Sequence, residues 1–227
     1  MLFKWFSRLY HAIVFIIFLG IFVYLFAPIL VEAKPISNAF INEIHYDNIG
    51  LDVNEFIEIA GDGSIDLLGW SLHLYNGSNG EEYKSFSLHS WLYIEPISGF
   101  GILPIKVTGL QNGSPDGVVL FDGLNIIQFL SYEGVFTATS GIAEGVVSTD
   151  IGVFQGPTTS VGDSLQLTGH GKLYSDFIWG ESQPSSFGAA NVRQSFVGNN
   201  LNLTPVNEPS SFLLFLFILL RLFKKNI

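Results

Sequence analysis

The chain has 227 residues, a formal net charge of −10 and no cysteine, so it can form neither a disulfide nor a thiol-based active site. Between its two hydrophobic ends, residues 34–206 hold five basic and 18 acidic residues, which gives that region a net charge of −13. Nucleic-acid binding draws much of its affinity from basic residues that neutralise phosphates, so this charge argues against DNA or RNA as a partner.

Residues 1–33 have the three parts of a secretory signal peptide. Lys4 and Arg8 form a charged start, residues 12–30 are almost entirely apolar, and Val31 and Ala33 occupy the −3 and −1 positions of a cleavage site. An uncleaved membrane anchor is the alternative, because a helix over 12–30 would be about 28 Å long, close to the ~30 Å core of a bilayer. Both interpretations predict export of the residues that follow.

Residues 34–198 carry the pattern of an all-β domain. Short runs of β-branched and aromatic residues alternate with Gly, Asn, Asp and Ser, and no sustained helical period occurs. This pattern predicts one antiparallel β-sandwich over Ala39–Phe196, with no helix longer than two or three turns. The predicted strands are 40–46, 55–60, 70–75, 82–88, 99–106, 117–122, 126–132, 164–168 and 177–179. Asn76–Gly80 and Asp122–Asn125 are the predicted hairpin loops.

Two segments lack this pattern. Thr137–Thr159 is rich in Gly, Thr and Val without clear alternation, so we expect a long loop or an irregular edge that crosses the sandwich and carries function. Residues 199–206 are predicted to be a polar linker between the domain and the C-terminal segment.

The C-terminal segment, residues 207–227, combines a short polar motif, an apolar stretch and a basic end. Glu208 and Pro209 belong to the polar motif. The basic residues are Arg221, Lys224 and Lys225. A helix over 212–223 would be about 18 Å long, which is too short to span a membrane comfortably. Because basic residues flank both apolar segments on their outer sides, the positive-inside rule predicts that both ends are cytoplasmic and the middle is outside.

The densest polar group surrounds the turn after the first predicted strand. Asp47, Asn48, Asp52 and Glu55 are candidate ligands of a weakly bound Ca²⁺, which prefers six to eight hard oxygen ligands. The spacing does not fit an EF-hand loop, and Asx turns that cap the hairpin explain the same residues. A metal-dependent hydrolase that uses His45 with Asp47, Asp52 and Glu55 is the other alternative.

Other features favour a protein without catalytic activity or a cofactor. The sequence holds no metalloprotease, nucleophile-elbow, P-loop or Cys/His motif, so we expect no catalytic residues. For Glu55 and Glu58, we expect at least one carboxylate at the rim of the sheet that accepts backbone N–H groups from an adjacent loop.

Five ordered motifs indicate a family. They are NEIHYDN at 42–48, EFIEIAG at 55–61, LLGWSLHLYNGSNG at 67–80, NGSPDGVVLFD at 112–122 and QFLSYEG at 128–134. In this order they resemble the lamin-tail domain of bacterial secreted proteins, which implies an immunoglobulin-like β-sandwich. Similar domains also precede secreted nucleases, so a nuclease-associated accessory domain is a further alternative. The chain lacks the long additional region of such a nuclease, and we expect no nuclease activity.

The C-terminal segment resembles the PEP-CTERM sorting signal of Gram-negative bacteria, although Asn207 stands where the usual motif has its first proline. This resemblance implies recognition by an exosortase-type protease-transpeptidase. Together, the two resemblances imply an exported, non-enzymatic binding or structural module at the cell surface or in the extracellular matrix. Its expected partner is a surface protein or polysaccharide, bound through the sandwich edges and Thr137–Thr159.

Overall fold

The computed structural model describes residues 38–198, and residues 1–37 and 199–227 lie outside the described part. The predicted signal peptide, linker and sorting signal lie entirely in the two undescribed regions, so they stay predictions. Within 38–198, no helix is long and apolar enough to cross a membrane. The two helices there are single 3₁₀ turns, Gly141–Ala143 and Tyr174–Asp176, in agreement with the predicted lack of long helices.

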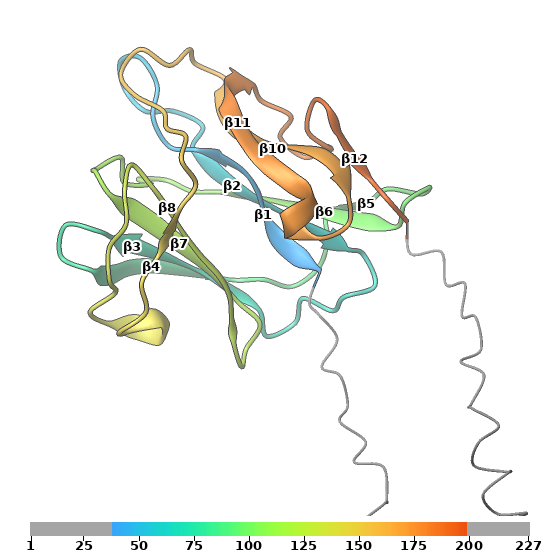
Figure 1. Cartoon of the computed structure of the whole chain (residues 1–227), viewed down its shortest axis with the longest axis horizontal. Coiled ribbons are helices and arrows are strands. Elements are labelled where there is room, and N and C mark those ends of the chain that lie inside the picture. The colour runs from blue at the N-terminus through green and yellow to red at the C-terminus, as the bar shows by residue number, and fades with distance from the viewer. Residues whose placement is uncertain (1–37, 199–227) are drawn as a thin grey trace, which may run out of the picture. The chain divides into compact units, whose positions relative to one another are not determined.

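The strands of the described region form two sheets (Figure 1). The order in the first sheet is β11 (Phe177–Pro184), β10 (Asp163–Gly171), β1 (Ala39–His45), β2 (Phe56–Asp62), β6 (Phe100–Lys106) and β5 (Tyr93–Ile94), with β12 (Gln194–Phe196) also paired to β10. The order in the second is β4 (Glu81–Ser87), β3 (Ser71–Asn76), β7 (Asp116–Phe121), β8 (Ile126–Tyr132) and β9 (Thr149–Asp150).

Two edge pairings correct the expectation of a purely antiparallel sandwich. β12 runs parallel to β10, and β9 runs parallel to β8. Both short strands follow long connections instead of tight hairpins, which allows the chain to return in the same direction. The remaining pairs are antiparallel, as predicted.

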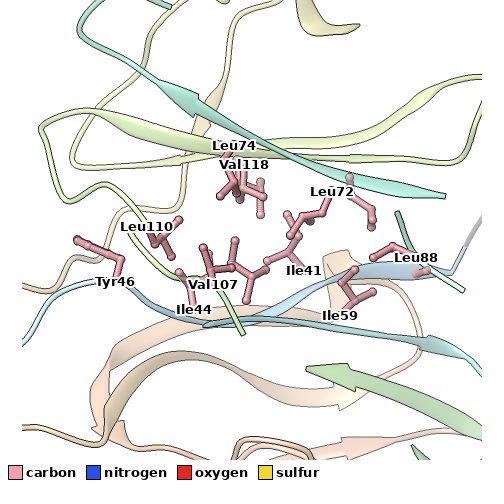
Figure 2. Close-up of a cluster of buried hydrophobic side chains, with 14 of the residues drawn as sticks. Ile41, Ile44, Tyr46, Ile59, Leu72, Leu74, Leu88, Val107, Leu110 and Val118 are labelled. Carbon is pink, nitrogen blue, oxygen red and sulfur yellow. The ribbon is translucent and has the colours of Figure 1, made fainter. Parts of the chain in front are cut away.

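The main core lies between the two sheets (Figure 2). Ile41 and Ile59 come from the first sheet and meet Leu72 and Val118 from the second, and all four side chains are buried. In β3 the buried Leu72 and Leu74 alternate with half-buried Ser71 and His73, as a strand with one core-facing side requires. This core confirms the all-β, two-sheet sandwich.

The outer face of each sheet is also covered, by a segment that comes later in the chain. Phe196 of β12 stacks on Phe100 with ring centroids 4.3 Å apart, and both belong to a cluster on the outer face of the first sheet. On the second sheet, Phe129 is covered by Phe136 and Ala143 from the segment after β8. Every residue of β1 is therefore buried, including the polar ones.

All nine predicted strands are present, although β10 and β11 are longer than predicted. Both predicted hairpin loops connect their strands, and Gly80 and Gly123 supply the positive φ values that these turns need, +76° and +92°. The short strands β5, β9 and β12 were not predicted.

Candidate functional site

Three chain segments meet at one end of the sandwich, which we call the acidic end. They are the β1–β2 loop (46–55), the β6–β7 loop (107–115) and Glu133, which follows β8. Asn112 donates a hydrogen bond to Asp52 Oδ2 at 3.1 Å, and Ser114 donates to the Glu133 backbone oxygen at 2.9 Å. These hydrogen bonds join the loops to one another. They hold Asp52 and the backbone of Glu133 in place at the acidic end.

The β1–β2 loop is a capped turn. The Asn48 side-chain oxygen accepts the Val53 N–H at 3.1 Å, while its amide donates to the backbone oxygens of Ile49 and Leu51. The Asn48 N–H in turn donates to Asp52 Oδ1 at 3.2 Å. The side chain of Asn48 is thus engaged in the turn. A turn capped by Asx side chains is the interpretation that the sequence analysis gave as the alternative to calcium binding.

Asp47, Asn48 and Asp52 lie close together, but the side chain of Asn48 is engaged in the turn, so two of the four candidate calcium ligands remain. Burial, followed by the negative charge of Asp52 and of Glu133, raises the pKa of Asp47. Glu55 faces elsewhere, because its Oε2 accepts the Gly109 N–H at 2.8 Å. Within residues 38–198, no group of three or more His, Cys, Asp or Glu side chains has an arrangement that could hold a metal ion. Asp47 and Asp52 are therefore better placed to bind a cation than Asn48 and Glu55, whose side chains are engaged elsewhere. Calcium binding stays a prediction.

His45 is held inside the protein. It is 1% exposed, its Nδ1 lies 3.1 Å from Gln155 Oε1, and its Nε2 lies 3.0 Å from the Val53 backbone oxygen. Both ring nitrogens therefore face protein oxygens. The structure does not bring this imidazole and the Glu55 carboxylate to a shared centre with Asp47 and Asp52, which the hydrolase hypothesis requires.

The side chain of Gln155 attaches the chain segment between β9 and β10 to the acidic end. Its Oε1 accepts the Tyr46 N–H at 2.8 Å, and its Nε2 donates to the Asp163 backbone oxygen and to Ser182 Oγ, both at 3.1 Å. The sequence did not single out Gln155 or Glu133. They lie 109 and 87 residues from Tyr46, whose hydroxyl donates to Glu133 Oε1 at 2.8 Å. No local pattern links such distant positions.

Glu55 and Glu58 both accept backbone N–H groups from adjacent loops, as expected for at least one of them. The donor is Gly109 for Glu55 and Gly188 for Glu58. Glu58 is fully buried instead of lying at the rim, because the segment after β11 covers it. Directly opposite it on β1 lies Glu43, which is also fully buried.

Thr137–Thr159 is irregular, and its regular parts are the 3₁₀ turn Gly141–Ala143 and β9. Its backbone is attached to the sandwich at several points, including Thr139 N to the Gly80 oxygen at 2.8 Å and Ile151 N to the Ser131 oxygen at 2.9 Å. Val147 and Phe154 are nevertheless 59% and 65% exposed. The segment thus presents apolar side chains on an anchored backbone.

Comparisons with protein-family models, with curated proteins and with solved structures find no match for this chain.

Proposed function

We propose that the chain is an exported, non-enzymatic module that binds a surface protein or polysaccharide at the surface or in the extracellular matrix of a Gram-negative bacterium. Its sandwich is of the lamin-tail, immunoglobulin-like type, and its C-terminal segment directs it to an exosortase-type sorting enzyme. The terminal hydrophobic segments associate it with the membrane before processing. The two-sheet fold and the ordered sequence motifs support this proposal.

The observation that carries the proposal is the exposed apolar surface of Thr137–Thr159. Val147 and Phe154 are exposed although hydrogen bonds fix the backbone on both sides of Val147 and directly after Phe154. Binding through an already ordered segment loses little conformational entropy, and exposed aromatic side chains are enriched at binding surfaces. The neighbouring β9 is an edge strand of two residues, so it adds unpaired backbone groups to the same surface.

The test is retention of the full chain in the washed extracellular matrix of the producing bacterium. We expect the double substitution Val147→Ser and Phe154→Ser to lower the retained fraction several-fold, because it removes the exposed apolar surface without touching the core. Leu124→Ser, at the 87% exposed tip of the β7–β8 hairpin, is the matched control and should leave retention unchanged.

Enzymatic digestion of the matrix then identifies the partner class. Release by a protease indicates a protein, and release by a polysaccharide-degrading enzyme indicates a polysaccharide. Retention of the double variant at the level of the unchanged chain would contradict the proposal.

A further inference from the structure

An open pocket of about 290 Å³ lies at the acidic end, next to the β3–β4 turn. Asn76 and Ser78 of that turn line it together with residues 111–116, which run from the β6–β7 loop to the first residue of β7. None of these lining residues is basic, and none is aromatic. The pocket therefore offers no charge for an anion and no ring on which a sugar could stack.

Asp116 is the buried charged group of this pocket. It is 1% exposed, its Oδ1 accepts the Gly77 N–H at 3.0 Å, and its Oδ2 has no hydrogen-bond partner among residues 38–198. Burial raises the pKa of Asp116 to about 6, against the opposing effect of the Gly77 and Gly113 N–H groups, so the carboxyl is mostly ionised at pH 7. A buried carboxylate with an unused oxygen is unfavourable unless an opposite charge or a donor reaches it.

Several side chains around Asp116 direct hydrogen-bond donors to protein oxygens other than its Oδ2. The hydroxyls of Ser78 and Ser114 and the amide of Asn112 all donate to other protein oxygens. A ligand group that contacts Asp116 Oδ2 must donate a hydrogen bond to it, and the negative charges of Asp52 and Glu133 nearby favour one that is positively charged.

Gly113 lies directly against this carboxylate. A Cβ atom at Gly113 would lie 3.1 Å from Asp116 Oδ2, closer than most real Cβ contacts. The backbone of Gly113 does not have the positive φ that would itself demand glycine. Substitution by alanine is therefore compatible with the chain path and narrows the approach to Oδ2 without changing any charge.

We propose that this pocket binds an organic cation, namely the guanidinium or ammonium group at the end of an arginine or lysine side chain of a protein partner. Asp116 Oδ2 accepts a charge-assisted hydrogen bond from the cation, and the alkyl stem occupies the remaining space beside Pro115. Ca²⁺ fits less well, because it takes six to eight oxygen ligands and the pocket supplies a single carboxylate.

This inference rests on the proposed function in one respect: it assigns the partner to the class of basic proteins. The net charge of −13 in residues 34–206 favours the approach of such a partner. The pocket itself is independent of the apolar surface at Val147 and Phe154, so the two can be tested separately.

The test uses the full chain in mild detergent and the probe Nα-acetyl-arginine methylamide, with Nα-acetyl-citrulline methylamide as the neutral molecule of nearly the same shape. Titration calorimetry or ligand-observed NMR measures both affinities. We expect arginine to bind at least about tenfold more tightly than citrulline, because a hydrogen bond to a charged group is lost in the second case. Equal binding of the two molecules by the unchanged protein would overturn the proposal without any variant.

Two variants locate the binding. Asp116→Asn keeps the acceptor for the Gly77 N–H but removes the charge, and Gly113→Ala obstructs Oδ2; each should weaken arginine binding about tenfold or more. The control is Asp66→Asn in an exposed turn, where Asp66 Oδ1 accepts the Leu68 N–H and the same charge is lost. If the arginine probe is attracted only by the overall negative charge, Asp66→Asn and Asp116→Asn should weaken its affinity equally and Gly113→Ala should not change it. That result would overturn the proposal. So would preferential binding of Ca²⁺ that excludes arginine.

The outcome is distinguishable from failure of the proposed function. If arginine binding is absent while matrix retention still depends on Val147 and Phe154, the pocket inference alone is wrong. If arginine binds at Asp116 but the chain is not retained in the matrix, the pocket inference is supported and the surface-binding proposal is wrong.

Discussion

Glu43 and Glu58 form a buried carboxylate pair directly opposite each other on β1 and β2. Glu43 accepts hydrogen bonds from Ser164, Ser185 and Ser186, with Ser186 contributing both its N–H and its hydroxyl. Glu58 accepts fewer hydrogen bonds, from Asn42 and Gly188. Its burial, followed by the negative charge of Glu43, raises the pKa of Glu58 to about 8. At pH 7 Glu58 is therefore mostly protonated in the folded protein.

This shift predicts that folding stability falls as pH rises from about 4.5 to 8. The folded state holds a proton on Glu58 that the unfolded chain, with its ordinary pKa of 4.5, has already released, so the unfolded state binds fewer protons in this window. The contribution is roughly 3–5 kcal/mol over the window, at up to about 1.4 kcal/mol per pH unit. Urea unfolding of the full chain at pH 5, 6, 7 and 8 measures it.

Glu58→Gln is the control for this prediction, because glutamine resembles the protonated acid and does not titrate. The variant should lose most of the pH dependence. A smaller slope of the same sign should persist below pH 6 from Asp116, whose pKa is also raised. A wild-type protein that becomes more stable from pH 5 to 8 would contradict the assignment.

Asp47 and Asp52 allow a direct test of calcium binding. A divalent cation would relieve the repulsion that helps to raise the pKa of Asp47. Extracellular calcium modules are often tuned to about 10⁻⁴–10⁻³ M, and an ion at tenfold Kd adds about 1.4 kcal/mol, or a few degrees in Tm. We expect Ca²⁺ to raise Tm more than Mg²⁺ does, and Asp47→Asn or Asp52→Asn to abolish the difference. The exposed Asp66→Asn should preserve it, and equal shifts with both ions would exclude a specific site.

At the scale of elements, the Gln155 side chain attaches the β9–β10 connection to the residue after β1, to β10 and to β11. Gln155 is 1% exposed and binds the Tyr46 N–H, the Asp163 oxygen and Ser182. We expect Gln155→Ala to lower the free energy of unfolding by about 2–4 kcal/mol, because it leaves several of these buried groups without a partner. Gln111→Ala, at a half-buried position of the β6–β7 loop, is the matched control and should cost less than about 1 kcal/mol. Denaturant unfolding of both variants measures these changes. Equal losses of unfolding free energy would mean that Gln155 has no special part in attaching the connection.

Most strands were predictable because each has enough residues to show its pattern. β3 and β8 are bounded by Gly-, Asn- or Asp-containing turns, and their apolar runs fall within one residue of the predicted ends. β5 and β9 have two residues each, too few for any alternation. β12 has three residues and owes its position to the stacking of Phe196 on Phe100, a contact between distant parts of the chain.

At the scale of the whole molecule, burial of both faces of the first sheet explains what the sequence missed at the candidate site. Asn42, Glu43 and His45 are polar, and Glu43 and His45 alternate with the apolar Ile44, yet all three polar residues are buried. The residues that cover and satisfy them include Asn191 and Gln194, about 150 residues later in the chain. The sequence located Asp47 and Asp52 because turn chemistry is local, whereas the pocket around Asp116 depends on how separate loops meet.

The processing of the two ends is the remaining prediction at this scale. Val31 and Ala33 fit cleavage after residue 33, and a helix over 212–223 of about 18 Å is short for a permanent membrane anchor. We therefore expect the mature protein to begin at Lys34 and to lack the basic C-terminal residues. Intact-mass and terminal-peptide mass spectrometry of protein isolated from a bacterium with an exosortase-type enzyme measures both ends.

Substitution at the sorting motif separates processing from general proteolysis. Pro209→Ala should block removal of the C-terminal segment, so that Arg221, Lys224 and Lys225 remain in the isolated protein and the chain stays in the membrane fraction. Pro205→Ala, four residues earlier in the predicted linker, is the matched control and should be processed normally. If both variants and the unchanged chain keep Met1 and Ile227, the protein is anchored in the membrane at both ends. The sandwich would then be exported but tethered, and neither end would be a cleaved signal.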